Sequence, residues 1–195
     1  NGFLQTSMIP TSLTGSHKFG KGDSDVKVFF VNANSPTKYL PLKICTYFKH
    51  MQKFDIFGRL ILDITRNVFE GCLQTKRVLI RHVTFNKFNS DLLSDLHNLE
   101  IFNVESTSIE SIPANFFQFN KKLLEINMPG NRLKYIEAEI PKTVTAMILS
   151  NNICIDKFTR YNNTQAVIDE INKKCRNNTA FVPLPSETPS QQRIS

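Results

Sequence analysis

The chain has 195 residues, of which 41% are hydrophobic, and its 24 Lys and Arg residues exceed its 17 Asp and Glu residues by a net charge of +7. This length and apolar content suffice for one compact domain with a sizeable core. No apolar stretch reaches the roughly 18 residues that a membrane span requires, so we expect no span in this chain. The basic balance favours acidic partners, but without a basic helix, zinc finger or RNP-like strand we expect no nucleic acid binding.

Residues 1–24 are rich in Ser, Thr, Gly and Lys without sustained periodicity, and we predict a flexible arm. Within it, residues 15–21 fit the phosphate-binding pattern GxxxxGK. Gly22, however, stands where a Ser or Thr should hold magnesium, and neither a preceding strand nor a following helix is evident. The pattern therefore does not indicate a nucleotide site, and we expect no cofactor.

Residues 26–31, VKVFFV, are predicted to form a strand, and turn-forming residues follow at 32–36. We expect residues 25–50 to serve as an N-terminal cap, because the repeats that follow have an apolar first edge to cover.

Residues 51–153 repeat one apolar spacing, with a period of 24 residues in the units 51–74, 75–98 and 99–122 and shorter copies at 123–143 and 144–153. Two apolar columns lie two residues apart, which is the spacing of one face of a strand. A period in the twenties indicates units that stack to share one core. The inward columns are Phe54 and Ile56, Val78 and Ile80, Phe102 and Val104, and Ile126 and Met128.

This spacing resembles the leucine-rich repeat, LxxLxLxxNxLxxLPxxxFxxLxx, most closely in the third unit through Leu99, Phe102, Val104, Pro113 and Phe117. The resemblance implies an α/β fold, a short solenoid. Its parallel β-sheet lies on the concave face, and its convex side is irregular, 3-10 or helical. A capping strand and a C-terminal cap helix close its ends.

The family places a buried asparagine after each strand, where this chain has Arg59, Val83, Thr107, Asn131 and Asn152. Because the asparagine satisfies backbone groups of the turn, we expect irregular turns in the first two units.

The four cysteines form no CxxC pair and share no zinc-like spacing with the four histidines, so we expect no metal site. Two local disulfides are one interpretation, and a reduced intracellular chain with Cys72 as a small buried hydrophobe is another. The resemblance implies one bridge at each end of the solenoid, as in extracellular members of the family. These bridges are Cys45–Cys72 and Cys154–Cys175.

Residues 164–175 are predicted to form a helix with Asn163 or Thr164 as N-cap, within a C-terminal cap at 154–179. Its apolar face holds Val167, Ile171 and Cys175 at a spacing of four. Two sequons make Asn162 and Asn177 candidate glycosylation sites and, with the cysteines, favour an extracellular location. We predict a disordered Pro-rich tail at 180–195.

No nucleophile elbow, HExxH motif or glycine-rich strand-to-helix turn appears, and carboxylates such as Asp55 and Asp95 are spaced as solvated or turn residues, so we expect no catalytic residue and no enzymatic activity. The resemblance instead implies that outward strand positions on the concave face bind the ligand. The candidate residues are Lys53, Phe57, Arg77, Leu79, Arg81, His82, Ile101, Asn103, Glu105, Asn127 and Arg132. Arg beside apolar neighbours favours a protein contact, and merely solvated strand residues are the alternative. Replacing Arg77 or Arg81 by Glu is expected to weaken binding with little loss of stability.

The chain resembles small extracellular leucine-rich repeat proteins of animals, including secreted immune proteins of insects. The first hypothesis is therefore a secreted module of innate immunity that recognises a protein or an anionic surface. An ectodomain fragment of an adhesion or signalling receptor is the second, and an inhibitor of an extracellular enzyme is the third. The sequence defines neither the ligand nor the oligomeric state.

Overall fold

The computed structural model describes residues 18–32, 38–160 and 163–176. The predicted glycosylation sites Asn162 and Asn177 and the predicted tail at 180–195 lie outside the described residues, as does the predicted arm up to residue 17.

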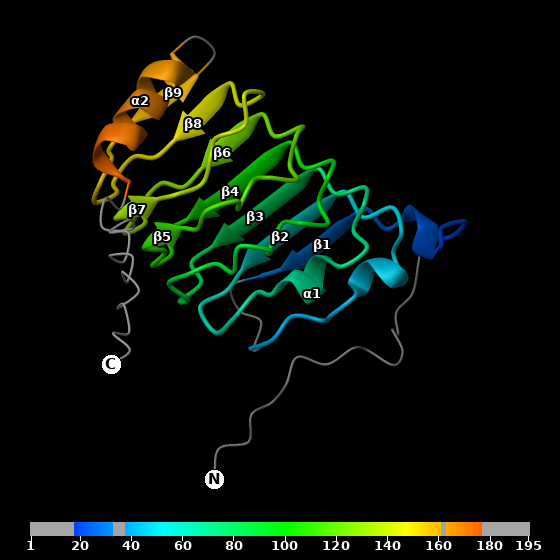
Figure 1. Cartoon of the computed structure of the whole chain (residues 1–195). Helices are drawn as coiled ribbons and strands as arrows, with labels where there is room; N and C mark the ends of the chain where they lie inside the picture. The colour runs from blue at the N-terminus through cyan, green and yellow to red at the C-terminus, as the bar shows by residue number, and fades with distance from the viewer. Residues whose placement is uncertain (1–17, 33–37, 161–162, 177–195) are drawn as a thin grey trace, which may run out of the picture.

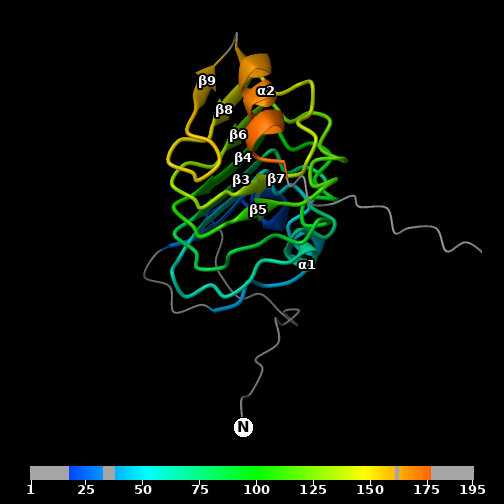
Figure 2. The ribbon, with the colours of Figure 1, turned by 60° about the vertical axis from the view of Figure 1, so that its left-hand side comes forward.

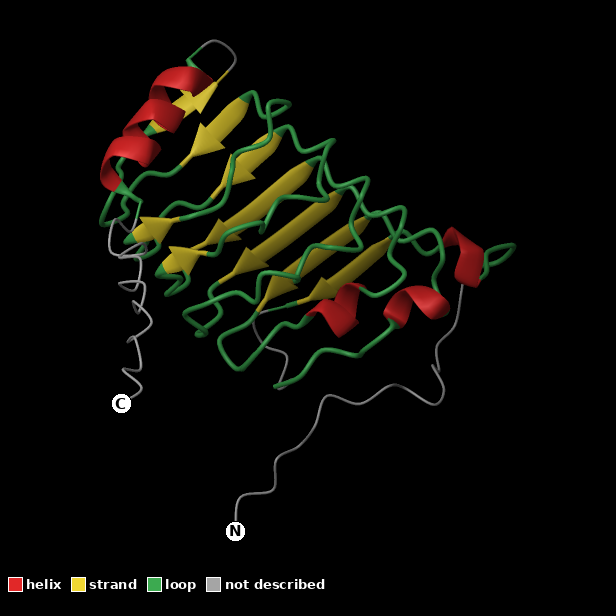
Figure 3. Cartoon of the chain, viewed as in Figure 1, coloured by secondary structure: helices red, strands yellow, loops and turns green. Residues whose placement is uncertain are grey.

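The described residues form a parallel-sheet solenoid of about five turns, which confirms the predicted fold class (Figures 1 and 3). The main sheet has the strand order β1-β2-β3-β4-β6-β8-β9, and every neighbouring pair is parallel except β8 with β9. Its strands are β1 (Val28–Val31), β2 (Lys53–Phe57), β3 (Arg77–Arg81), β4 (Ile101–Glu105), β6 (Glu125–Asn127), β8 (Ala146–Ile148) and β9 (Phe158–Arg160). Phe54 pairs with Val78, and Val78 with Phe102, so the 24-residue period is the register of the sheet.

The inward columns form the core as predicted. Phe54, Val78 and Phe102 are fully buried in one continuous apolar cluster. The ring of Phe102 lies 5.7 Å from that of Phe116 and 6.0 Å from that of Phe117, which come from the opposite side of the same unit. Each repeat therefore supplies core side chains from its strand and from the segment opposite the strand, and successive repeats stack on one another.

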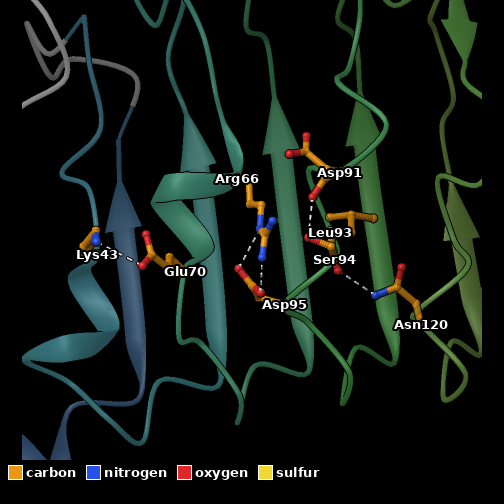
Figure 4. A network of polar contacts seen from close by, with 8 residues as sticks. All are labelled: Lys43, Arg66, Glu70, Asp91, Leu93, Ser94, Asp95 and Asn120. Carbon is orange, nitrogen blue, oxygen red and sulfur yellow. Dashed lines mark hydrogen bonds and ion pairs between the residues drawn. The ribbon is translucent and has the colours of Figure 1, made fainter.

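The side opposite the sheet carries short elements: the 3-10 helix η2 (Ile44–Thr46), helix α1 (Arg66–Phe69), and a two-stranded sheet of β5 (Ser111–Ile112) and β7 (Tyr135–Ile136). Polar contacts join successive units here (Figure 4). The Arg66 guanidinium donates to both carboxylate oxygens of Asp95, at 3.1 and 3.0 Å. Asn120 is fully buried, and its Nδ2 donates to the carbonyls of Leu93 and Leu96, at 3.1 and 2.9 Å.

The predicted asparagine ladder is present in the last two units. Asn131 Nδ2 donates to the Val104 carbonyl at 2.8 Å, and its Oδ1 accepts from the Thr107 amide at 3.2 Å. Asn152 repeats this pattern one unit later, with Nδ2 bonded to the Met128 carbonyl at 2.8 Å. In the first two units Arg59 is exposed and Val83 is an apolar buried side chain, so neither supplies these bonds.

Both ends of the stack are closed by a disulfide and a capping element. Cys45 pairs with Cys72 and Cys154 with Cys175, the pairs that the resemblance implied. At the first end, the predicted strand starts at Val28, two residues late, and a 3-10 helix, η1 (Asp23–Asp25), precedes it.

Helix α2 (Thr164–Lys174) covers the other end beside β9, with Val167, Ile171 and Cys175 buried (Figure 2). Asn163 occupies the N-cap position, but its side chain makes no capping hydrogen bond.

Candidate functional site: the outward face of the main sheet

Residues paired in a parallel sheet point to the same side, so the register defines the outward face, which we call the sheet face. One row crosses it through Val28, Lys53, Arg77, Ile101 and Glu125, and a second through Phe30, Asp55, Leu79, Asn103 and Asn127. A third, shorter row holds Phe57, Arg81 and Glu105. The structure therefore brings most of the candidate residues together across β2, β3 and β4.

Asp55 lies at the centre of this arrangement and is only 8% exposed. Its carboxylate accepts from Lys53 Nζ at 2.9 Å and from the Arg81 guanidinium at 2.5 Å. Burial raises the pKa of the carboxyl, but the hydrogen bonds from Lys53 and Arg81 outweigh burial and hold the pKa below its ordinary value. Asp55 therefore remains ionised at neutral pH and fixes the two cations. The prediction of a solvated Asp55 is wrong, because strand pairing places it between two long basic side chains.

Arg81 is also held by aromatic contacts. Its guanidinium carbon lies 5.4 Å from the centroid of the Phe57 ring, a cation–π distance. The Phe57 ring meets the His82 ring edge-on at 4.9 Å. His82 follows the strand in a left-handed conformation, with φ of 54°, and its amide donates to the Glu105 carbonyl at 3.1 Å. Arg81, Phe57 and His82 thus form a pre-organised cluster rather than a set of free side chains.

Arg77 differs from Arg81. It is exposed, and among the described residues it makes no ion pair or side-chain hydrogen bond. Half-buried Leu79 and Ile101 lie nearby on the same face. Across β1 to β3 the three cations Lys53, Arg77 and Arg81 face one carboxylate, so this part of the sheet face carries two net positive charges.

The first strand, predicted only as part of the N-terminal cap, adds apolar surface to the sheet face. Phe30 is 60% exposed beside Asp55, and exposed Val28 lies beside Lys53. Their alternation with inward Phe29 and Val31 was the available signal: a capping strand that joins the sheet in register must also extend its outward face.

Four candidates contribute less to the cluster. Asn103 and Glu105 are half-buried on β4, while Asn127 is buried and its Nδ2 donates to the Glu125 carboxylate. The Oδ1 atoms of Asn103 and Asn127 are buried without a hydrogen-bond partner in this structure. Arg132 follows β6 outside the strand and does not join the cluster. It lies near Glu110, whose pKa is lowered mainly by the hydrogen bond from Lys134 and less by the charge of Arg132.

No group of three or more His, Cys, Asp and Glu side chains gathers in the described ranges in an arrangement that could hold a metal ion. None of the helices described has both the length and the apolar content needed to cross a membrane.

The stacked units, the parallel sheet and the disulfide caps define a short solenoid of the leucine-rich repeat type. No protein-family model matches the sequence, and no curated protein matches it. By structure the chain is similar to the Toll ectodomain in the solved Toll–Spätzle complex, a molecular hub in Drosophila development and innate immunity. The TM-score is 0.54 at 15% sequence identity, and the match covers 69% of this chain and 21% of that one. At this identity the similarity shows the fold, and the chain spans about a fifth of its neighbour's length.

Proposed function

We propose that the chain is an extracellular recognition module that binds a protein through the part of the sheet face formed by β1 to β4. The observation that carries the proposal is Arg77, which is exposed among apolar side chains and has no ion pair with any described residue, beside an Arg81 held by Asp55 and Phe57. Arg and aromatic residues dominate binding energy at protein interfaces, and side chains ordered in advance lose less entropy on binding.

Two further observations support this proposal. The disulfides Cys45–Cys72 and Cys154–Cys175 suit an oxidising, extracellular environment. The structural neighbour is a receptor ectodomain solved with a protein bound to it. A protein ligand with an acidic residue for Arg77 and an apolar side chain for Phe30 and Leu79 fits the chemistry of the face. A role in innate immunity, and glycosylation at Asn162 and Asn177, belong to the same proposal.

The test compares two variants with the unaltered chain. Arg77→Glu reverses the charge of an exposed cation on the sheet face, and Lys87→Glu makes the same charge change at an exposed residue off the face. Each chain is immobilised and exposed to extracellular fluid, and each captured protein is then purified and its affinity measured. We expect that a captured protein binds Arg77→Glu about 30-fold or more weakly than the unaltered chain and binds Lys87→Glu as tightly as the unaltered chain. A partner bound equally by all three chains would place the interface elsewhere.

A receptor ectodomain is the second candidate, favoured by the Toll ectodomain as neighbour. Fractionation of cells that make the native protein separates the two: recovery from the medium supports a secreted module, and recovery with the membrane pellet supports a receptor.

A further inference from the structure

Five β-turns stack along the edge of the sheet where its strands begin. Each precedes a strand and is closed by the same backbone hydrogen bond, from Met51 to Phe48, Thr75 to Cys72, Leu99 to Leu96, Leu123 to Asn120 and Val144 to Pro141, at 3.0–3.1 Å. The tips of these turns are Lys49-His50, Leu73-Gln74, His97-Asn98, Lys121-Lys122 and Lys142-Thr143. One further residue follows the closing residue of each turn: Gln52, Lys76, Glu100, Leu124 and Thr145. We call these five residues and the ten tip residues together the turn edge.

Backbone hydrogen bonds between successive units hold the turn edge in register. The Lys76 amide donates to the Gln52 carbonyl, and the Glu100 amide to the Lys76 carbonyl, both at 2.8 Å. In the next two units the Leu124 amide donates to the Glu100 carbonyl and the Thr145 amide to the Leu124 carbonyl, both at 2.9 Å. Neighbouring turns are thus about one strand spacing apart, so five turns give a row about 19 Å long.

Positive charge is concentrated on this edge. None of the ten tip residues is acidic, and four are Lys. Glu100, the one acid in the next column, pairs with Lys76 at 2.9 Å. Two other acids near the edge are in ion pairs, Asp95 with Arg66 and Glu139 with Arg176. Glu125, which follows Leu124, belongs to the sheet face and accepts from Asn127. Lys49, Lys121 and Lys142 are exposed and make no ion pair within the described residues.

Apolar side chains stand among these lysines. Leu73 is 54% exposed, and Leu124 and Phe119 are each 45% exposed. Leu73 and Leu124 belong to the turn edge itself, and Phe119 reaches it by packing edge-on against His97 at 6.2 Å. Such residues have no role in binding a sulfated polysaccharide, which offers little apolar surface.

The cations of the turn edge are Lys and His, without a single Arg. Lys is depleted at protein interfaces, where Arg is enriched, whereas Lys with exposed aliphatic and aromatic neighbours suits the headgroup layer of an anionic membrane. Arg77 and Arg81, in contrast, lie on the sheet face. We propose that the turn edge is a docking surface for an anionic lipid bilayer, with the lysines on the headgroups and Leu73, Phe119 and Leu124 dipping below them. This goes beyond the proposed protein recognition, which uses a different face.

The first test is flotation of the whole, oxidised chain with vesicles of phosphatidylcholine alone or with roughly a third of phosphatidylglycerol. We expect binding to the anionic vesicles only. Lys49→Glu/Lys121→Glu should reduce partitioning at least about 25-fold, since each basic side chain contributes about fivefold at such a surface. Arg59→Glu/Lys87→Glu makes the same net charge change at exposed positions near the other ends of the strands and should bind like the unaltered chain.

The second test uses the absence of tryptophan from the chain. Phe119→Trp introduces a single reporter on the turn edge, and Tyr135→Trp a single reporter at an exposed position in the second sheet. Anionic vesicles should shift the emission of the first to the blue and leave the second unchanged.

Three results would overturn the proposal: no flotation of the unaltered chain, equal loss in both double variants, or no blue shift from Phe119→Trp. Retention on a sulfated polysaccharide without vesicle binding would likewise overturn it and assign the edge to that polymer. Because the vesicles contain no protein, these outcomes are independent of whether the sheet face binds a partner.

Discussion

Asp55 and Arg81 form a partly buried ion pair across two neighbouring strands of the sheet face, with a separation of 2.5 Å. Lys53, on the other side of the carboxylate, completes the triad. The pair links two adjacent repeats, so the part of the molecule proposed to bind a ligand is also one that holds the stack together.

Removing the Asp55 charge should destabilise the fold. Asp55→Asn leaves two cations facing each other without their counter-ion, and because Lys53 and Arg81 are each a third exposed, we expect a loss of about 2 kcal/mol rather than the full value for a buried pair. Urea unfolding measures it. Asp63→Asn, at an exposed carboxylate, should change the free energy of unfolding by less than about 0.5 kcal/mol. Equal losses in the two variants would show that the triad adds nothing.

The contribution of Asp55 to stability should depend on pH. The pKa of Asp55 is lowered in the folded chain, so its contribution is present above the unfolded-state value of 3.8 and is lost as the pH falls through the lower, folded value. The stability difference between the unaltered chain and Asp55→Asn should therefore be constant from about pH 7 to 5 and shrink below about pH 4. Urea titrations across this range check it, and a difference that persists at the lowest pH would exclude ionisation as its cause.

Replacing Arg77 and replacing Arg81 by Glu should have different effects on the stability of the fold. Their positions in the sequence predict little loss of stability from either change, but Arg81→Glu places a second carboxylate beside buried Asp55 and is expected to cost about 2–4 kcal/mol. Arg77→Glu breaks no ion pair of the described structure and should stay within about 0.5 kcal/mol. Thermal unfolding of both variants compares them directly, and a large loss in Arg77→Glu would mean that its side chain supports the fold.

Phe102→Ala should destabilise the chain by about 3–5 kcal/mol, because the ring is fully buried and its removal leaves a cavity among Phe88, Phe116 and Phe117. Phe119→Ala, at a ring 45% exposed, is the matched control and should cost less than about 1 kcal/mol. Denaturant midpoints of the two variants provide the measurement. An unchanged midpoint for Phe102→Ala would contradict the inward orientation of that column.

Asn131→Ala should cost about 1–3 kcal/mol, because it leaves the Val104 carbonyl and the Thr107 amide without their partner. Asn86→Ala, at an exposed amide, should be nearly neutral. Chemical denaturation monitored by circular dichroism compares them, and similar midpoints would mean that water replaces the lost bonds.

The 24-residue period predicted stacked units in which Phe54, Val78 and Phe102 share a core, and the resemblance to the leucine-rich repeat supplied the parallel sheet and the caps. The pairing of charges could not be predicted in the same way. Lys53, Asp55 and Arg81 alternate with core residues as any solvated face does, and only the register shows that Asp55 is enclosed. Asn120 was missed because its column holds Cys72 and Leu96, which gave no sign of a polar position.

Of the proposed ligand-binding residues, the placement of Lys53, Arg77, Leu79 and Arg81 on one face followed from strand alternation alone. The same alternation in residues 28–31 also indicated an outward Phe30, but that strand was predicted only as a cap and its outer side chains were not counted as part of the face.

The two disulfides tie the first and last layers of a stack in which each layer contacts only its neighbours. In such a stack the terminal repeats have a neighbour on one side only, so they are expected to unfold locally before the central ones. Reduction of the two disulfides should therefore make the first and last repeats accessible to proteases and to hydrogen–deuterium exchange. The backbone amides of β3 and β4, in the middle of the solenoid, should remain protected from exchange.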